Sequence, residues 1–321
     1  MVFHLRASVV AVAAVAAVAA SPVRAGSDLV FANGFEPHIG FEIATPVIPV
    51  PAQTSATYCY YFRAPNSATL GVKRWASTMT AGVHHLILFA TYDSNWNPSE
   101  RQPAGSLTQI PCGFSEGGGN AAWVYAAHDP EEELVLPTDD GGGTPLAVEV
   151  APSQPMFVQM YVRNEGNVPL NASAVLTADA LAPSVAYTKS ATYLAANLTL
   201  SIPTPAAGFP AQQTCAVPVG AKFWWLSTRT HHFASESRIE DADSPLVVST
   251  DWEHPAVMTF GAAPFYSFSG TGMTYRCTYD NPTGAPVHAG EDEESNEACI
   301  AVGYFFPAER PSLCIGNLGP L

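Results

Sequence analysis

The sequence predicts an all-β protein built from two consecutive β-sandwich domains. Short segments rich in Val, Tyr, Phe, Trp and Thr recur along the chain, and clusters of Pro, Gly and Asn separate them, which is typical of strands and turns. No apolar stripe with helical periodicity continues beyond two turns, and 28 Pro with 24 Gly disfavour helix interiors. The length of 321 residues corresponds to roughly two domains of about 150 residues each. Together these observations indicate stacked β-sheets.

Eight segments have the strand pattern. They span residues 57–63, 83–92, 156–163, 172–178, 222–230, 256–260, 272–279 and 300–306. Residues 182–187 are expected to link the two domains, and the Pro-rich residues 201–210 are expected to form a second connection. We therefore predict a first sandwich at residues 43–184 and a second sandwich at residues 185–321.

The N-terminal residues resemble a secretory signal peptide. Arg6 supplies a positive charge, residues 7–20 form an Ala/Val run that is too short to span a bilayer, and Val23-Arg24-Ala25 offers a cleavage site. We expect a signal peptide at residues 1–25 and a lead at residues 26–42, with an N-terminal membrane anchor as the alternative. Export predicts a secreted or periplasmic protein, and no later stretch is apolar enough to span a membrane.

The chain is acidic, with 28 Asp and Glu against 13 Lys and Arg and a formal net charge of −15. Removing residues 1–25 takes away two Arg and no acidic residue, so the mature charge becomes −17. This balance argues against nucleic acid and anionic membranes as partners, because both need clustered Lys and Arg. If the protein is active, we expect a small-molecule or peptide substrate. The acidic clusters at residues 131–133, 139–140 and 291–294 are expected to lie in solvated loops.

The cysteines indicate disulfides. There are six, an even number: Cys59, Cys112, Cys215, Cys277, Cys299 and Cys314. No Cys-x-x-Cys zinc spacing occurs, and an exported protein meets an oxidising compartment. Two cysteines fall in the first predicted domain and four in the second, which fits pairing within each domain. The spacing alone leaves the pairing open.

Two histidine-containing segments are candidates for metal binding. The His84-His85 pair follows Gly82 at the start of an apolar run. Adjacent residues on a regular strand point to opposite faces, so both imidazoles can bind one ion only at a strand end or a bulge, which Gly82 permits. In the second segment, Arg229 and His231 share a strand face, but a guanidinium cannot ligate a metal.

A series of short motifs follows a recognisable order. The first half contains Thr57-Tyr58-Cys59, His84-His85-Leu86-Ile87-Leu88-Phe89, Cys112, Trp123-Val124-Tyr125-Ala126, Leu134-Val135-Leu136-Pro137 and Val158-Gln159-Met160. The second half contains Arg229-Thr230-His231-His232, Glu253-His254-Pro255, Thr259-Phe260-Gly261, Arg276-Cys277-Thr278-Tyr279, Asn296-Glu297-Ala298-Cys299 and Cys314. In this order and spacing, residues 55–315 resemble the copper type II, ascorbate-dependent monooxygenases, the family of peptidylglycine α-hydroxylating and dopamine β-monooxygenases.

The resemblance implies two jelly-roll-like β-sandwiches that each hold one copper and face each other across a cleft. In the family, three His of the first domain bind one copper, and a His-x-His pair and a Met of the second domain bind the other. Imidazole and thioether suit copper that cycles between Cu(I) and Cu(II). Dioxygen is activated at the second copper, ascorbate supplies electrons through the first, and a C–H bond is hydroxylated. The disulfides implied are Cys59–Cys112, Cys215–Cys314 and Cys277–Cys299.

The resemblance transfers three of the six copper ligands to this sequence. His84 and His85 match two ligands of the first copper, and His231 matches one ligand of the second. The other three positions are occupied by Tyr161, Arg229 and Ala298. Weaker alternative ligands are Tyr161, His232 and His288.

These replacements leave three hypotheses. The first is a copper monooxygenase that works with displaced ligands. The second is a relative that binds at most one copper, at His84 and His85. The third is a metal-free pseudoenzyme that serves as an extracellular binding or interaction module. Arg229 favours the last two, because its charge repels a divalent ion by roughly 8 kcal/mol at about 4 Å and an effective dielectric constant of about 20. The sequence assigns no catalytic or substrate-binding residue and no oligomeric state.

Overall fold

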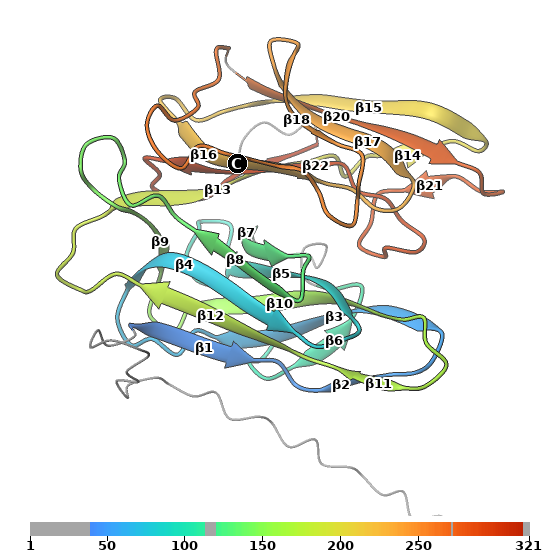
Figure 1. Cartoon of the computed structure of the whole chain (residues 1–321), viewed down its shortest axis with the longest axis horizontal. Helices are drawn as coiled ribbons and strands as arrows, with labels where there is room; N and C mark the ends of the chain where they lie inside the picture. Colours follow the sequence, from blue (N-terminus) through green and yellow to red (C-terminus); the bar gives the residue numbers. More distant parts are fainter. Residues whose placement is uncertain (1–38, 113–119, 271, 317–321) are drawn as a thin grey trace, which may run out of the picture.

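The structure, a computed structural model, describes residues 39–112, 120–270 and 272–316. Every regular element within these ranges is a β-strand, and the strands form sheets that stack in layers (Figure 1). The all-β prediction is therefore confirmed, whereas the jelly-roll detail stays a prediction. The predicted signal peptide at residues 1–25 and most of the predicted lead lie outside the described residues. Within those residues, no helix is long and apolar enough to cross a membrane.

Two main sheets make up the first half of the chain. The outer sheet has the order β1-β12-β4-β9, with β8 beside β4, and the inner sheet has the order β6-β3-β10-β5-β7. The outer strands are β1 (Gly40–Ala44), β4 (Leu70–Met79), β8 (Glu131–Val135), β9 (Leu146–Val150) and β12 (Ala174–Ala180). The inner strands are β3 (Thr54–Arg63), β5 (Val83–Tyr92), β6 (Leu107–Gln109), β7 (Asn120–Ala127) and β10 (Pro155–Asn164). A short ribbon pairs β2 (Ile48–Val50) with β11 (Leu170–Ala172).

The second half repeats this layering. Its inner sheet has the order β13-β22-β16-β19, with β23 beside β13, and its outer sheet has the order β15-β20-β17-β18. The inner strands are β13 (Thr188–Ala196), β16 (Lys222–Arg229), β19 (Val257–Thr259), β22 (Ile300–Phe306) and β23 (Ser312–Ile315). The outer strands are β15 (Ala206–Ala216), β17 (Ala234–Asp241), β18 (Ser244–Ser249) and β20 (Gly272–Asn281). A short ribbon pairs β14 (Ser201–Ile202) with β21 (Val287–His288).

The two halves are joined by a shared sheet and by apolar packing. β9 pairs in parallel with β13, with Leu146 opposite Thr188, so the outer sheet of the first half continues into the inner sheet of the second. Tyr304 of β22 packs in the apolar core of the first half, and its hydroxyl donates to the carbonyl of Val124 at 2.8 Å. The boundary predicted at 184/185 lies in the link between β12 and β13, but a continuous sheet crosses it.

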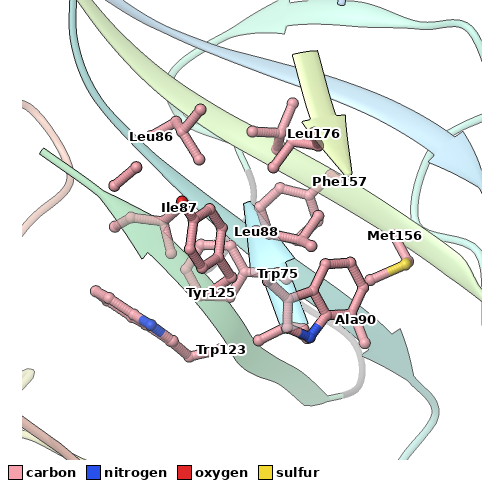
Figure 2. Close-up of a cluster of buried hydrophobic side chains, with 14 of the residues drawn as sticks. Trp75, Leu86, Ile87, Leu88, Ala90, Trp123, Tyr125, Met156, Phe157 and Leu176 are labelled. Carbon is pink, nitrogen blue, oxygen red and sulfur yellow. The ribbon is translucent and has the colours of Figure 1, made fainter. Parts of the chain in front are cut away.

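The core of the first half lies between its two sheets. Figure 2 shows Trp75 and Leu176 of the outer sheet among Leu86, Leu88 and Met156 of the inner sheet. All five side chains are buried, and burial of an apolar side chain of this size stabilises the fold by about 1.5–3 kcal/mol. The face of β5 that carries Leu86 and Leu88 packs in this core. The opposite face of β5 is turned toward the second half.

Each of the eight predicted strand segments coincides with observed strands, but two predicted boundaries are wrong. β1 begins at Gly40, inside the predicted lead, because Phe41 and Ile43 alternate into the core. Residues 201–210 include β14 and the first part of β15, so they are not a simple connection. Pro210 is tolerated in β15 because this strand forms the edge of its sheet.

Three disulfides pair all six cysteines. They join Cys59 to Cys112, Cys215 to Cys314 and Cys277 to Cys299. These are the three pairs that the resemblance implies. The second bond ties β15 of the outer sheet to β23 of the inner sheet, so it clamps the layers of the second half together. Three disulfides fit an oxidising compartment.

Candidate functional site

A β-bulge brings His84 and His85 together at the start of β5. The register with β10 shifts just after Tyr161, the partner of His85, and this leaves His84 as the extra residue. Gly82 precedes the bulge with a φ of +91°, a conformation that glycine adopts without strain. The two imidazole rings therefore lie on one side, and their Nδ1 atoms are 3.1 Å apart.

Hydrogen bonds from the second half fix the protons on both rings. An Arg229 N–H donates to His85 Nε2 at 2.8 Å, and because arginine only donates, this nitrogen must accept. The proton of neutral His85 then lies on Nδ1 and is donated to His84 Nδ1. His84 in turn carries its proton on Nε2, which lies 3.1 Å from Glu253 Oε1. All four ring nitrogens thus have partners within the protein, and Trp252 stacks on His84 with ring centroids 5.4 Å apart.

Glu293 is the centre of a buried polar cluster between the halves. Its Oε1 accepts a hydrogen bond from Arg229 and lies 3.3 Å from His85 Nε2 and 3.3 Å from His231 Nε2. The side chain of Glu293 is only 3% exposed and that of Arg229 only 7%. We call Arg229, Glu293, His85 and His231 the Glu293 cluster. It joins β5 of the first half to the end of β16 and the loop before β22.

Burial and charge together set the protonation of this cluster. Burial by itself raises the pKa of a carboxyl group, but the charge of Arg229 holds the pKa of Glu293 well below its usual range. Burial, and after it the charge of Arg229, lowers the pKa of His85 to about 4. Burial also lowers the pKa of His231. The cluster at neutral pH is therefore one ion pair flanked by two neutral imidazoles.

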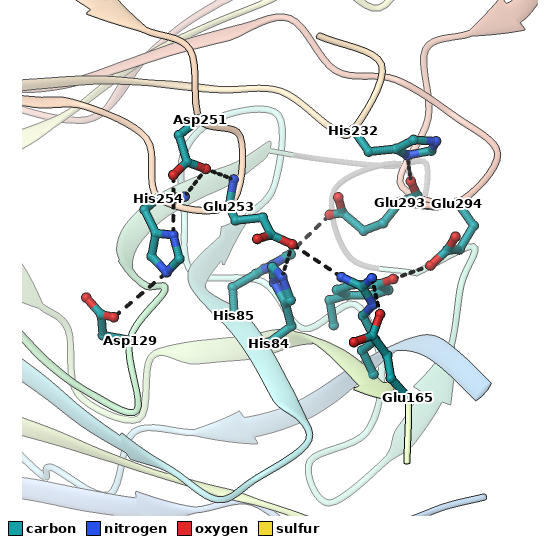
Figure 3. Close-up of polar contacts among 12 residues, drawn as sticks. His84, His85, Asp129, Glu165, His232, Asp251, Glu253, His254, Glu293 and Glu294 are labelled. Carbon is teal, nitrogen blue, oxygen red and sulfur yellow. Dashed lines mark hydrogen bonds and ion pairs between the residues drawn. The ribbon is translucent and has the colours of Figure 1, made fainter. Parts of the chain in front are cut away.

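A more exposed polar rim surrounds the Glu293 cluster, and Figure 3 shows part of both. Arg163 of β10 donates to Glu253 Oε1 at 3.2 Å, the same oxygen that His84 contacts. The hydroxyl of Tyr161 donates to Glu294. Each of these contacts joins a side chain of the first half to a carboxylate of the second, so the rim holds the two halves in one register.

The residues at the implied copper sites do not fit copper. The guanidinium of Arg229 donates a hydrogen bond to His85 Nε2, so this nitrogen has no free lone pair for a metal ion. Burial, and then the hydrogen bond to Glu294, raises the pKa of Tyr161, which disfavours the phenolate that a metal needs. Ala298 has no ligand atom. In the part of the chain that the structure describes, no group of three or more His, Cys, Asp or Glu could hold a metal ion.

The alternative ligands lie apart from one another. His232 Nδ1 lies 2.8 Å from the carbonyl of Glu293, and its ring packs on Phe233 with centroids 3.9 Å apart. His288 is exposed on β21 and does not join the Glu293 cluster. Of the sequence candidates, the structure brings together His84, His85, Tyr161, Arg229 and His231.

Two contributors were not expected from the sequence. Glu293 belongs to the acidic group at residues 291–294, and the expectation that this whole group is solvated is wrong for Glu293, because Arg229 pairs with it in the interior. His128, after β7, lies beside His85 with ring centroids 5.9 Å apart. No local pattern marks either residue, since both contacts depend on chain segments far apart in sequence.

Comparisons with known proteins give no family. No protein-family model matches the chain, and no curated protein matches it. Among solved structures, PNGase F, a glycosylasparaginase from Flavobacterium meningosepticum, is similar over 88% of this chain and 99% of its own, with 10% identity and a TM-score of 0.38. The major capsid protein P2 of bacteriophage PM2 is similar over 83% of this chain and 97% of its own, with 8% identity and a TM-score of 0.29. At these TM-scores neither likeness bears on the function of this chain.

Proposed function

We propose that this chain is an exported binding protein whose frame resembles the copper monooxygenases and which works without copper chemistry. The single observation that supports this is the ion pair between Arg229 and Glu293, which occupies the position of an implied copper ligand and contacts both His85 and His231. A metal ion there would have to displace a buried cation, and an uncompensated buried charge is costly. The cluster joins His85 of the first half to Arg229, His231 and Glu293 of the second, so it suits holding the two halves in one arrangement around a ligand.

Copper loading tests this proposal. The full-length mature chain is incubated with Cu(II), alone and with ascorbate, then desalted and analysed for copper per chain and for oxygen uptake. We expect copper well below one ion per chain and no ascorbate-dependent oxygen uptake. Two tightly held coppers per chain with ascorbate-dependent oxygen uptake would contradict the proposal.

A restored variant makes the test sharper. In the double variant Arg229→His with Glu293→Gln, the guanidinium and its counter-charge are both removed, and a second imidazole lies two residues before His231. We expect this variant to retain more copper than the wild type under the same loading, because the repelling cation is gone. Equal retention by the two proteins would show that Arg229 is not what excludes the ion.

A second candidate function is a single-copper site at His84 and His85. The bulge favours it, because it brings the two Nδ1 atoms within 3.1 Å of each other, and copper there would replace the hydrogen bond between them. Copper bound there would be lost in the double variant His84→Ala with His85→Ala. Copper content that is unchanged in this variant would exclude the site.

A further inference from the structure

A cavity of about 240 Å³ lies between the two halves, next to the parallel pairing of β9 with β13 (Figure 1). The first half lines it with residues of β5, β7 and β9 and with Trp96. The second half lines it with residues 189–192 of β13 and with residues 308–311, which connect β22 to β23. No member of the Glu293 cluster lines this cavity. Because a cavity of about 150 Å³ holds benzene, this one accommodates a six-membered ring that carries substituents.

Trp96 lies at this cavity in a rare backbone conformation. Its φ is +65°, in the left-handed region that a bulky residue adopts only at a cost in free energy. Asp93 fixes the turn, because its Oδ1 accepts the backbone N–H groups of Asn95 and Asn97 at 2.8 and 2.9 Å and its carbonyl accepts that of Trp96 at 3.1 Å. The Trp96 ring packs on Tyr92, which also lines the cavity. We call these two residues the aromatic wall; its strained, well-anchored tryptophan indicates a functional surface.

The second half contributes two charged side chains that are free to bind a ligand. Arg310 lies over the face of Trp96, with its Cζ 5.3 Å from the ring centroid. Arg310 and its neighbour Glu309 are both exposed, and neither side chain makes a hydrogen bond or an ion pair within the part of the chain that the structure describes. The contact of an exposed arginine with an aromatic ring is weak, so a ligand can take its place on Trp96.

Gln154 supplies a buried acceptor that is not used by the protein. Its side chain lines the cavity, and the residue is only 2% exposed. Its Nε2 donates to the carbonyls of Thr91 and Pro155 at 3.0 and 3.3 Å, which fixes the orientation of the amide. Its Oε1 accepts no hydrogen bond from a described residue, and it is not among the atoms that are closed off from the surface. Buried carbonyl oxygens normally accept a hydrogen bond, so this one calls for a donor in the cavity.

The charges around the cavity balance. The four charged residues that line it are Glu149, Lys189, Glu309 and Arg310, two of each sign. Lys189 pairs with Glu149 at 2.8 Å. Glu309 and Arg310 could also bind a zwitterion, but they lie on the exposed rim, where water and salt weaken ionic contacts. The buried group, Gln154 Oε1, is neutral. The cavity therefore favours a neutral ligand whose polar groups both donate and accept, and the hydroxyl group does both.

We propose that this cavity binds a neutral pyranose sugar unit. The C–H face of the sugar ring lies on the aromatic wall, whose ring faces carry the negative part of the quadrupole. One hydroxyl group donates to Gln154 Oε1, and others contact Glu309 and Arg310 at the rim. This inference rests on the proposed function in one respect, because it names the ligand of an exported binding protein.

Isothermal titration calorimetry of the full mature chain tests the proposal. The probes are the methyl glycosides of glucose, galactose, mannose and N-acetylglucosamine, and we expect at least one to bind with a Kd of about 1 mM or below. Glucuronate, glucosamine and phenylalanine serve as the anionic, cationic and zwitterionic comparison compounds. None of them should bind more tightly than the best neutral glycoside. Failure of all four glycosides to bind would overturn the proposal, and tighter binding of phenylalanine would replace the sugar by a zwitterion. Tighter binding of glucuronate or glucosamine would overturn the neutral ligand.

Variants of Trp96 test the aromatic wall. Trp96→Asn removes the ring, and asparagine fits the positive φ, so the turn keeps its shape while glycoside affinity should fall by about tenfold or more. Trp96→Tyr keeps an aromatic face and should stay within about threefold of the wild type. Equal losses in the two variants would show that stacking on an aromatic ring does not hold the sugar.

A variant at the rim tests the same site without touching the turn. Arg310→Gln should lower glycoside affinity by about three- to tenfold, because it removes a charged donor. The matched control is Lys73→Gln, since Lys73 is also an exposed cation but does not line the cavity. Unaltered binding in both Trp96→Asn and Arg310→Gln would overturn the site. If Trp96→Asn does not fold, as circular dichroism would show, Arg310→Gln decides the location.

The sugar test and the copper test fail separately. Absence of glycoside binding together with the expected low copper content would overturn only the sugar site. Stoichiometric copper with ascorbate-dependent oxygen uptake would overturn the proposed function, whatever the glycosides do.

Discussion

The contact between the two halves has an apolar zone and a polar zone, and the two zones are stabilised by different interactions. In the apolar zone, Tyr304 and Trp224 stack with ring centroids 5.1 Å apart and pack into the core of the first half. In the polar zone, Arg229 and Glu293 are as deeply buried but rely on charge and hydrogen bonds. Apolar contact gains free energy from the area removed from water, whereas a buried ion pair must first offset the desolvation of both charges.

The apolar zone and the polar zone therefore contribute differently to the stability of the contact and to its arrangement. The apolar zone holds the halves together, and modest changes of side-chain volume there cost in proportion to what is removed. The polar zone adds little net stability as a pair, yet removing one member leaves the other charged and unpaired. We therefore assign to the polar zone the arrangement of the two halves around a ligand.

The largest expected effect is at the centre of the polar zone. Glu293→Gln removes the counter-charge of buried Arg229 and should lower the free energy of unfolding by about 3–5 kcal/mol in urea titrations. Glu294→Gln, one residue on and exposed, is the matched control and should lie within about 1 kcal/mol of the wild type. The double variant Arg229→Met with Glu293→Leu should recover most of the loss. If the single and double variants are equally unstable, the unpaired charge is not the cause.

The pH dependence of the polar zone should come next in size. The pKa of His85 is about 4 in the folded state and near 6.5, its ordinary value, in the unfolded state. Above pH ~6.5 His85 is neutral in both states, and its contribution to stability is fully present. That contribution is lost as the pH falls from 6.5 toward 4, by about 3 kcal/mol. Glu297 acts in the opposite direction, since burial raises its pKa to about 7 and folding then favours its protonated form at lower pH.

A single variant separates the contribution of His85 to the pH dependence of stability from the opposite contribution of Glu297. His85→Gln keeps an acceptor for Arg229 and cannot become charged. Relative to the wild type it should therefore gain about 2 kcal/mol of stability between pH 7 and pH 4.5, measured by urea unfolding at both values. A stability difference between the two proteins that does not change with pH would show that His85 does not titrate in this window.

The strands were predictable wherever the local hydrophobic pattern of the sequence reflects burial. Residues 83–92 contain the continuous apolar run 86–90, residues 300–306 are apolar or Gly throughout, and the two segments form the buried strands β5 and β22. β4 was missed, because Lys73 and Arg74 interrupt its apolar residues. β15 was missed because its prolines suggested a link, although an edge strand tolerates them.

The site was predictable only in part. Motif order identified His84, His85, Arg229 and His231, and all four lie together. It gave no sign of Glu293, because a glutamate in an acidic run looks like a solvated residue until the fold places it against Arg229. A buried countercharge is a property of two segments 64 residues apart, and no local pattern encodes it.

In the apolar zone, removal of one polar contact should have a smaller effect. Tyr304→Phe deletes the hydrogen bond to the Val124 carbonyl and keeps the ring between its neighbours. We expect a loss of about 1 kcal/mol in the free energy of unfolding. A loss as large as that of Glu293→Gln would mean that the two zones do not differ as proposed.

The smallest expected effect is at the rim of the polar zone. Glu253 accepts from His84 and Arg163 but is 37% exposed, so water competes for both contacts. Glu253→Gln should lower the free energy of unfolding by less than about 1 kcal/mol, and high salt should shrink the difference further. Glu165→Gln, whose carboxylate contacts only Arg163 among the described partners, is the control. Glu253 and Glu293 each contact an imidazole and an arginine. A small, salt-sensitive loss at Glu253 beside a large, salt-insensitive loss at Glu293 would therefore identify burial as the cause of the difference.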